Sequence, residues 1–190
     1  SIVAQQYMEQ YGDGIAGVIL SGTFGTLGDT TEAEAAIDQA IASDGLEAPS
    51  MVIAGMFGAF NEPFEGDTGF EWLSRDTAEV QKYVDDPWCG TFPLSNEFVR
   101  DFFGGMAEIW KPENEARIPT SLPVYIISGD QDPAGAFTEA VNVLVARYEE
   151  LGLADLTVKF YPQARHEILN ETNRDEVHDD ILRWLNARVE

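Results

Sequence analysis

Apolar residues recur at helical spacing at the start of the chain and then give way to a short continuous apolar run. In residues 1–11, SIVAQQYMEQY, apolar side chains recur near the helical period, and the glycines of residues 12–14 end the pattern. Residues 15–20, IAGVIL, are continuously apolar, which is typical of a strand covered on both faces of a parallel sheet. The start of the chain therefore predicts a helix followed by a buried strand that ends at residues 21–23.

Residues 24–120 follow a different pattern, which is helical and interrupted by glycine and proline. The predicted helices are one opened by a Thr31–Glu34 capping box and ending at Gly45, one over the apolar stretch 51–60, one capped by Asp76 with Glu79 and ending near residues 85–87, and one from Ser95 to Trp110. No internal repeat or low-complexity linker divides this part of the chain.

A strand–helix–strand–helix order follows from Pro123 onward. Residues 124–128, VYIIS, and 156–161, LTVKFY, predict strands, and helices are predicted over about 135–150 and 174–188. Two such strands joined by a crossover helix form a right-handed parallel unit. We therefore expect an α/β fold with three parallel strands, flanking helices and a helical insertion between the first strand and the second.

Composition and charge limit the classes of partner. The hydrophobic fraction of 44% is enough for a core and excludes a disordered chain. Eleven Lys and Arg residues against 34 Asp and Glu residues give a formal net charge of −23. A surface this acidic repels phosphate backbones and anionic lipid headgroups, so we expect no nucleic-acid partner.

Cysteine content and the length of apolar runs bear on location. Cys89 is the single cysteine, so the chain has no intrachain disulfide and no cysteine-based zinc site. No apolar run reaches the ~18 residues of a membrane helix, and no signal-peptide pattern opens the chain. We expect a cytoplasmic protein that does not span a membrane.

Two loops after neighbouring predicted strands carry groups that suit proton transfer. Asp130 and Asp132 follow the strand at 124–128, and His166 follows the strand at 156–161. Loops at the carboxyl ends of parallel strands gather at one edge of the sheet. An acid after one strand and a histidine after the next form the tail of a Ser…Asp…His relay.

These motifs resemble a known family. The stretches PVYIISGDQDP (123–133) and YPQARHEILNET (161–172) resemble the C-terminal part of an α/β-hydrolase, in the monoacylglycerol lipase or lysophospholipase subgroup that is also described as serine aminopeptidase-like. Residues 1–23 resemble the helix and strand that follow this family's nucleophile elbow. FEWLSRD (70–76) and YVDDPWCG (83–90) resemble its cap.

The resemblance covers essentially the whole chain and implies its organisation. Residues 1–23 and 121–190 would form the part of the hydrolase core that lies C-terminal to the elbow. Residues 24–120 would form a helical cap. The implied reaction is hydrolysis of a carboxylic ester by a lipase- or lysophospholipase-type enzyme, and no cofactor or metal is implied.

The resemblance puts the relay acid at Asp132 and the relay base at His166. Asp130 is the rival acid, but a residue directly after a glycine is expected to shape the turn. Alternatively, Asp132 caps a turn and His166 is an ordinary loop histidine. His178 is expected on the surface of an amphipathic helix.

The chain departs from the family pattern in one respect, because G-x-S-x-G occurs nowhere in it. Ser1 would align just after the last glycine of that motif, and it has neither a preceding strand nor a glycine two residues on, so we do not assign it as the nucleophile. Ser21 and Ser128 end predicted strands but stand on no strand-to-helix elbow. The nucleophile and the oxyanion-hole amides are therefore expected upstream of this chain.

A missing upstream half would also affect the sheet. The strand at 15–20 would expose a long apolar edge, which is an aggregation hazard unless another strand pairs with it. We expect the N-terminal half of the hydrolase fold to cover this edge, either as a separate fragment or as a segment missing from this sequence. The alternative is a homo-oligomer formed through the exposed sheet edge.

Large apolar side chains are frequent between residues 51 and 110 and suggest an apolar substrate. The residues expected to bind an acyl chain are Phe57, Phe60, Trp72, Trp88, Phe102 and Met106. Packing of the cap helices onto the sheet must account for at least half of the large apolar residues in this region. A non-catalytic half that binds an apolar ligand or assembles with a partner, and a peptidase of the same fold, remain alternatives.

Overall fold

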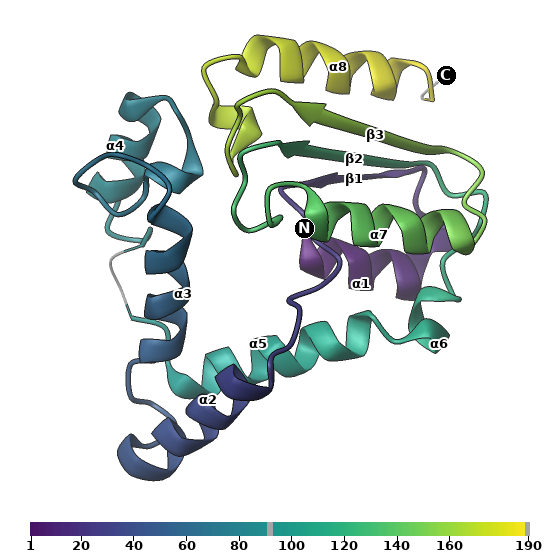
Figure 1. Ribbon diagram of the computed structural model, residues 1–190. Coiled ribbons are helices and arrows are strands. Elements are labelled where there is room, and N and C mark those ends of the chain that lie inside the picture. Colours follow the sequence, from purple (N-terminus) through teal and green to yellow (C-terminus); the bar gives the residue numbers. More distant parts are fainter. Residues whose placement is uncertain (91–92, 189–190) are drawn as a thin grey trace.

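A three-stranded parallel sheet forms the centre of the computed structural model, which describes residues 1–90 and 93–188 (Figure 1). The strands β1 (Val18–Ser21), β2 (Val124–Gly129) and β3 (Leu156–Tyr161) lie side by side in the order β1-β2-β3. Val18 pairs with Val124, which pairs with Leu156, so the three carboxyl ends lie at one edge of the sheet. The predicted α/β sheet is confirmed.

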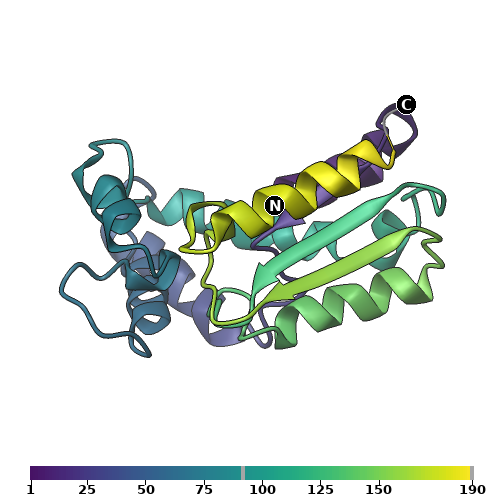
Figure 2. The ribbon, with the colours of Figure 1, turned by 90° about the horizontal axis from the view of Figure 1, so that it is seen from above.

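Helices cover both faces of the sheet because side chains alternate along each strand. Val124 and Ile126 of β2 pack in a core with α1 (Ile2–Tyr11) and α7 (Glu139–Glu150). Tyr125 and Ile127 face the opposite way and pack with α8 (Arg174–Asn186). Figures 1 and 2 show α8 on one side of the strands and α7 on the other.

The chain between β1 and β2 is helical. Its elements are α2 (Thr31–Asp44), α3 (Met51–Asn61), a 3-10 turn at Glu71–Leu73, α4 (Thr77–Asp85), α5 (Asn96–Ile109) and α6 (Pro112–Glu115). Further 3-10 turns lie at Gly12–Gly14 and Ile168–Asn170. α3 and α4 lie beyond the carboxyl ends of the strands, and α5 contacts α1 (Figure 1). Within the described residues, no helix is long and apolar enough to cross a membrane.

The helix caps agree with the sequence in two places and differ in one. Asp76 and Ser95 accept hydrogen bonds from backbone amides of the helices that follow them, as predicted. The predicted capping box at Thr31 is wrong by one residue, because α2 begins at Thr31 and its N-cap is Thr30. The Thr30 hydroxyl donates to the Glu34 carboxylate over 2.6 Å.

Two predicted elements are shorter in the structure. β1 begins at Val18 and not at residue 15, and at Gly17 an added Cβ would lie 2.9 Å from the Trp184 ring, so this backbone runs directly against α8. α7 begins at Glu139 and not near residue 135, because residues 136–138 have φ between 49° and 82°. Left-handed backbone cannot continue an α-helix of L-residues.

Candidate active site

The loops after β2 and β3 bring Asp132 and His166 together. Asp132 Oδ2 lies 2.9 Å from His166 Nδ1, and the Asp132 side chain is fully buried, whereas 26% of the His166 side chain is exposed. Asp132 Oδ1 accepts a hydrogen bond from the Ala134 amide over 2.9 Å. Because a carboxylate only accepts, this contact requires a proton on Nδ1, and in a neutral imidazole Nε2 is then an acceptor.

Asp130 lies in the same loop but makes different contacts. Its Oδ1 accepts the Gln163 amide over 2.7 Å, and its own amide donates to the Tyr161 carbonyl over 3.1 Å. These bonds join the turn after β2 to the turn after β3. Asp132, and not Asp130, is therefore the acid that reaches His166.

Two glycines allow the backbone to approach closely around this pair. A Cβ at Gly129 would lie 2.0 Å from the Ala164 carbonyl oxygen, far inside van der Waals contact. Gly22, at the end of β1, has φ of 55°, and a Cβ there would lie 3.1 Å from His166 Cε1. A side chain at either position would displace the loop that carries His166 or the imidazole itself.

Three of the residues predicted to bind substrate form an aromatic group beside His166. The Trp72 ring lies 5.0 Å from the imidazole, measured between ring centroids. Phe57 and Phe60 lie 5.8 Å and 5.3 Å from the Trp72 ring. Trp72 is itself buried, so its ring links Phe57 and Phe60 to the imidazole as one packed aromatic cluster.

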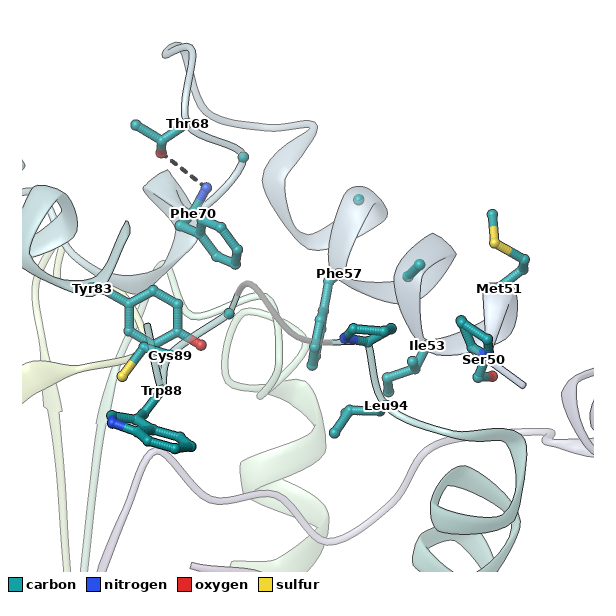
Figure 3. A pocket seen from close by; sticks show the side chains of 16 residues that line it. Ser50, Met51, Ile53, Phe57, Thr68, Phe70, Tyr83, Trp88, Cys89 and Leu94 are labelled. Carbon is teal, nitrogen blue, oxygen red and sulfur yellow. Dashed lines mark hydrogen bonds between the residues drawn. The ribbon is translucent and has the colours of Figure 1, made fainter. Parts of the chain in front are cut away.

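A cavity of about 630 Å³ lies next to the aromatic group. Figure 3 shows Phe57 and Ile53 of α3 on one side of it and Tyr83 and Trp88 on the other. Trp88 is 83% exposed and forms part of the cavity's wall. Phe57 belongs to both the cavity and the aromatic group, so the rings of Phe57 and Trp72 connect the cavity to His166, which does not line it.

The other two predicted substrate-binding residues lie elsewhere. Met106 is 1% exposed and belongs to the apolar core that α2, α3 and α5 share. Phe102 stacks on Phe98 of the same helix, with 6.1 Å between ring centroids. Met106 and Phe102 thus pack α5, and neither lines the cavity beside the aromatic group, although Met106 borders a second, smaller cavity of about 190 Å³. Apolar spacing alone does not separate side chains that pack helices together from those that line a cavity.

Glu171 is a buried residue at the site that was not predicted from the sequence. Its carboxylate is fully buried and accepts hydrogen bonds from the Arg75 side chain over 2.8 Å and from the amide of Arg165 over 2.9 Å. Burial opposes ionisation, but these donors outweigh it and hold the pKa of Glu171 below its ordinary value. The motifs at 70–76 and 161–172 contain all three residues, but nothing local shows that they meet.

Other reactive groups at the site are less suited to catalysis than the Asp132–His166 pair. Cys89 lines the cavity, and desolvation together with the Asp86 carboxylate raises the pKa of its thiol, which disfavours the nucleophilic thiolate. In residues 1–90 and 93–188, histidine, cysteine and carboxylate side chains form no group of three or more that could hold a metal ion. The Asp132–His166 pair is thus the arrangement best suited to proton transfer.

The sequence is similar to proteins of known class. A family model described as serine aminopeptidase, S33, matches residues 1–173. A monoglyceride lipase from Saccharomyces cerevisiae is 26% identical over 151 residues, which cover 74% of this chain and 46% of the yeast protein. The chain therefore spans about half the length of this curated relative.

Solved structures share the fold. A highly thermostable carboxyl esterase from Bacillus coagulans, solved with glycerol, is 28% identical, with a TM-score of 0.87 over 100% of this chain and 62% of the esterase. The yeast monoglyceride lipase, solved as a soluble variant with a substrate analogue, is 23% identical in the aligned region, with a TM-score of 0.66 over 100% of this chain and 59% of the lipase. A monoacylglycerol lipase from Paleococcus ferrophilus is 22% identical, with a TM-score of 0.67 over 98% and 65% of the two chains.

Proposed function

Because this chain belongs to the serine aminopeptidase S33 family of α/β-hydrolases, we propose that it supplies the acid and the base for hydrolysis of a carboxylic ester with an apolar acyl group. The observation that carries the proposal is the 2.9 Å contact between the buried Asp132 carboxylate and His166 Nδ1. The serine nucleophile comes from a segment upstream of Ser1, and residues 24–120 act as a cap that holds the acyl group.

In the proposed reaction, His166 Nε2 takes the proton of the serine hydroxyl while the serine oxygen attacks the ester carbonyl. Asp132 stabilises the imidazolium that forms, because its negative carboxylate accepts a hydrogen bond from Nδ1–H while the proton stays on the imidazole. His166 then gives its other proton to the leaving alkoxide, and an acyl-enzyme remains. Water, activated by the same nitrogen, releases the acid and restores the serine.

The surroundings of Ser1 support a nucleophile close to His166. The Ser1 hydroxyl donates to the Gly22 carbonyl over 3.3 Å, and Gly22 packs against the imidazole. The N-terminus also lies at the end of the sheet where the strands finish (Figure 1). A serine a few residues ahead of Ser1 would thus be within reach of His166. Within the described residues β1 pairs with β2 along one edge and with no strand along the other, which also supports a longer protein.

The aromatic group and the cavity support an apolar acyl substrate. Phe57 brings an apolar ring from the aromatic group into the cavity, and a volume of about 630 Å³ lies in the range of small-molecule sites. Similarity to a carboxyl esterase and a monoglyceride lipase favours an ester. A peptidase is the second candidate, because the matching family model is described as a serine aminopeptidase.

The test is turnover of p-nitrophenyl acyl esters by the protein that contains this chain and the segment preceding it. His166→Ala is expected to lower kcat roughly 10³-fold or more, because no other group moves the serine proton. His178→Ala is the matched control, since His178 is exposed on α8. Equal turnover by wild type and His166→Ala would reject the relay, and turnover of aminoacyl p-nitroanilides in place of esters would favour the peptidase.

A second variant tests the acyl site. Phe57→Ala removes the ring shared by the aromatic group and the cavity, so kcat/KM for a ten-carbon acyl ester should fall roughly tenfold relative to that for a four-carbon ester. Phe98→Ala is the control, because Phe98 is half exposed on α5. The same change for both acyl lengths would place the acyl chain elsewhere.

A further inference from the structure

The segment that carries His166 is bound to the helical region by backbone hydrogen bonds. The amide of His166 donates to the Trp72 carbonyl over 3.3 Å, and the amide of Glu167 donates to the Leu73 carbonyl over 2.7 Å. Residues 72–73 therefore run beside residues 166–167 at the end of the sheet. The position of the imidazole depends on residues nearly a hundred positions earlier in the chain as well as on β3.

The buried carboxylate of Glu171 also links residues 70–76 to the loop that carries His166, and we call this contact region the junction. Glu171 Oε1 accepts the amides of Arg75 and Arg165 over 3.0 Å and 2.9 Å. Its Oε2 accepts the Arg75 Nε over 2.8 Å and the Thr172 amide over 2.9 Å. All of these partners donate, so the site needs a group that only accepts. Glu171 thus joins the residue directly before His166 to the segment 70–76.

The guanidinium of Arg165 completes the junction. Its Nη1 donates to the carbonyls of Glu71 and Ser74 over 2.5 Å and 3.2 Å. Its guanidinium carbon lies 4.1 Å from the centroid of the Phe64 ring. The Ser74 hydroxyl in turn donates to the Asn170 carbonyl over 2.9 Å. Side chains from both segments therefore satisfy backbone groups of the other.

We infer that Glu171 and Arg75 are positioning residues for His166, an inference that rests on the proposed function. They act through the backbone. Glu171 accepts a hydrogen bond from the amide of Arg165, the residue before His166, and Arg75 binds Glu171 to the helical region. Breaking one partner of a buried ion pair leaves the other charge uncompensated, so the loop would rearrange. A displacement of about 1 Å in a reacting group can cost ~10²-fold in rate.

The expected effects are graded by the number of hydrogen bonds lost. Glu171→Gln replaces one accepting oxygen with an NH₂ group, which cannot accept hydrogen bonds from the surrounding donors. Because His166 would then be displaced, kcat should fall ~100-fold while KM changes less than ~3-fold. Arg75→Gln leaves the Arg75 backbone amide on Glu171, so kcat should fall only ~10-fold. Arg75→Lys keeps the charge and should recover part of that loss. Glu149→Gln, exposed on α7, is the control.

The assays use the protein with its upstream segment, at a temperature at which circular dichroism shows each variant folded. If Glu171→Gln does not fold, Arg75→Gln carries the test. An unchanged kcat in folded variants, with only a lower Tm, would overturn the inference and leave Glu171 a stabilising residue.

A second readout does not depend on turnover. The Nδ1 proton of His166, held by Asp132, should give a downfield NMR signal in the wild type that is lost or exchange-broadened in Glu171→Gln and retained in Glu149→Gln. A signal unchanged in Glu171→Gln would also overturn the inference. Loss of the signal in Glu171→Gln, with no ester or peptide turnover by the wild type, would support the positioning of His166 and reject the proposed function.

Discussion

Among residues 1–90 and 93–188, four buried glutamates lie in two regions, and their pKa values shift in opposite directions. Glu71 and Glu171 lie where the helical region meets the loop of His166, and the pKa of each is lowered, because hydrogen-bond donors outweigh burial there. Glu9 and Glu115 lie on α1 and α6, and the pKa of each is raised, above all by desolvation. A buried glutamate is thus stabilised as a carboxylate in the first region, whereas its surroundings disfavour the carboxylate in the second.

The supply of donors explains the difference. Burial opposes ionisation of Glu71, but the Thr68 amide and hydroxyl and the Asn61 amide donate to its carboxylate over 2.7–2.8 Å and bring its pKa to about 2. Desolvation raises the pKa of Glu9 to about 7, and the nearby Glu115 carboxylate adds to this. Glu115 is paired with Arg147 over 2.9 Å, which compensates its charge only in part.

The largest effect on stability is expected from removing the Glu71 carboxylate, which lies in the region rich in hydrogen-bond donors. Glu71→Gln removes a carboxylate that Asn61 and Thr68 bind, so the free energy of unfolding at pH 7 should fall by roughly 2–4 kcal/mol. Urea unfolding measures the change, and Glu62→Gln, at an exposed position directly after α3, is the control. An unfolding free energy equal to that of the control would contradict this account of the region.

The pH dependence of the same variant has a defined sign. Glu71 has a folded-state pKa of about 2, below its ordinary value of 4.5, so its contribution is complete above pH 4.5 and is lost as the pH falls toward 2. The difference between wild type and Glu71→Gln should therefore shrink over that interval. A difference that stays constant from pH 5 to pH 2 would show that Glu71 does not ionise as described.

A smaller and opposite effect is expected at Glu9. Its folded-state pKa of about 7 lies above its ordinary value of 4.5, so the wild type loses stability as the pH rises through that interval. Glu9→Gln should therefore raise Tm at pH 8 by roughly 3 °C and leave it nearly unchanged at pH 4. Glu150→Gln, exposed on α7, is the control. A lower Tm at pH 8 in Glu9→Gln would mean that a donor supports this carboxylate after all.

Local patterns predicted the sheet and the meeting of the loops. The strand at 156–161 has the predicted bounds. The strand at 124–128 extends by one residue, and its continuous apolar run marks a strand buried on both faces. The order of acids and a histidine after neighbouring strands predicted that these loops meet, since parallel strands end at one edge, and the family resemblance selected Asp132 over Asp130 as the acid. The resemblance to α/β-hydrolases of the monoacylglycerol lipase type is confirmed.

Contacts between distant segments could not be predicted in this way. Glu171 and Arg75 are 96 positions apart, and only the packing of the helical region against the sheet brings them together. Gly129 lies just beyond the predicted strand at 124–128, whereas in the structure it is the last residue of β2 and its missing side chain admits the Ala164 carbonyl. Met106 shares its spacing with residues that line the cavity next to Phe57 but is buried among helices away from that cavity. Each depends on tertiary structure that periodicity does not report.

The central claim is that Asp132 and His166 act as one unit in the reaction, and a double-mutant cycle on kcat/KM for an acyl ester tests it most directly. Asp132→Asn should lower kcat/KM roughly 10⁴-fold and His166→Ala by a similar factor, and the double variant should be no slower than His166→Ala. Asp130→Asn, in the same loop, should stay within ~3-fold of wild type. Losses that multiply in the double variant, or near-wild-type activity of Asp132→Asn, would contradict the claim.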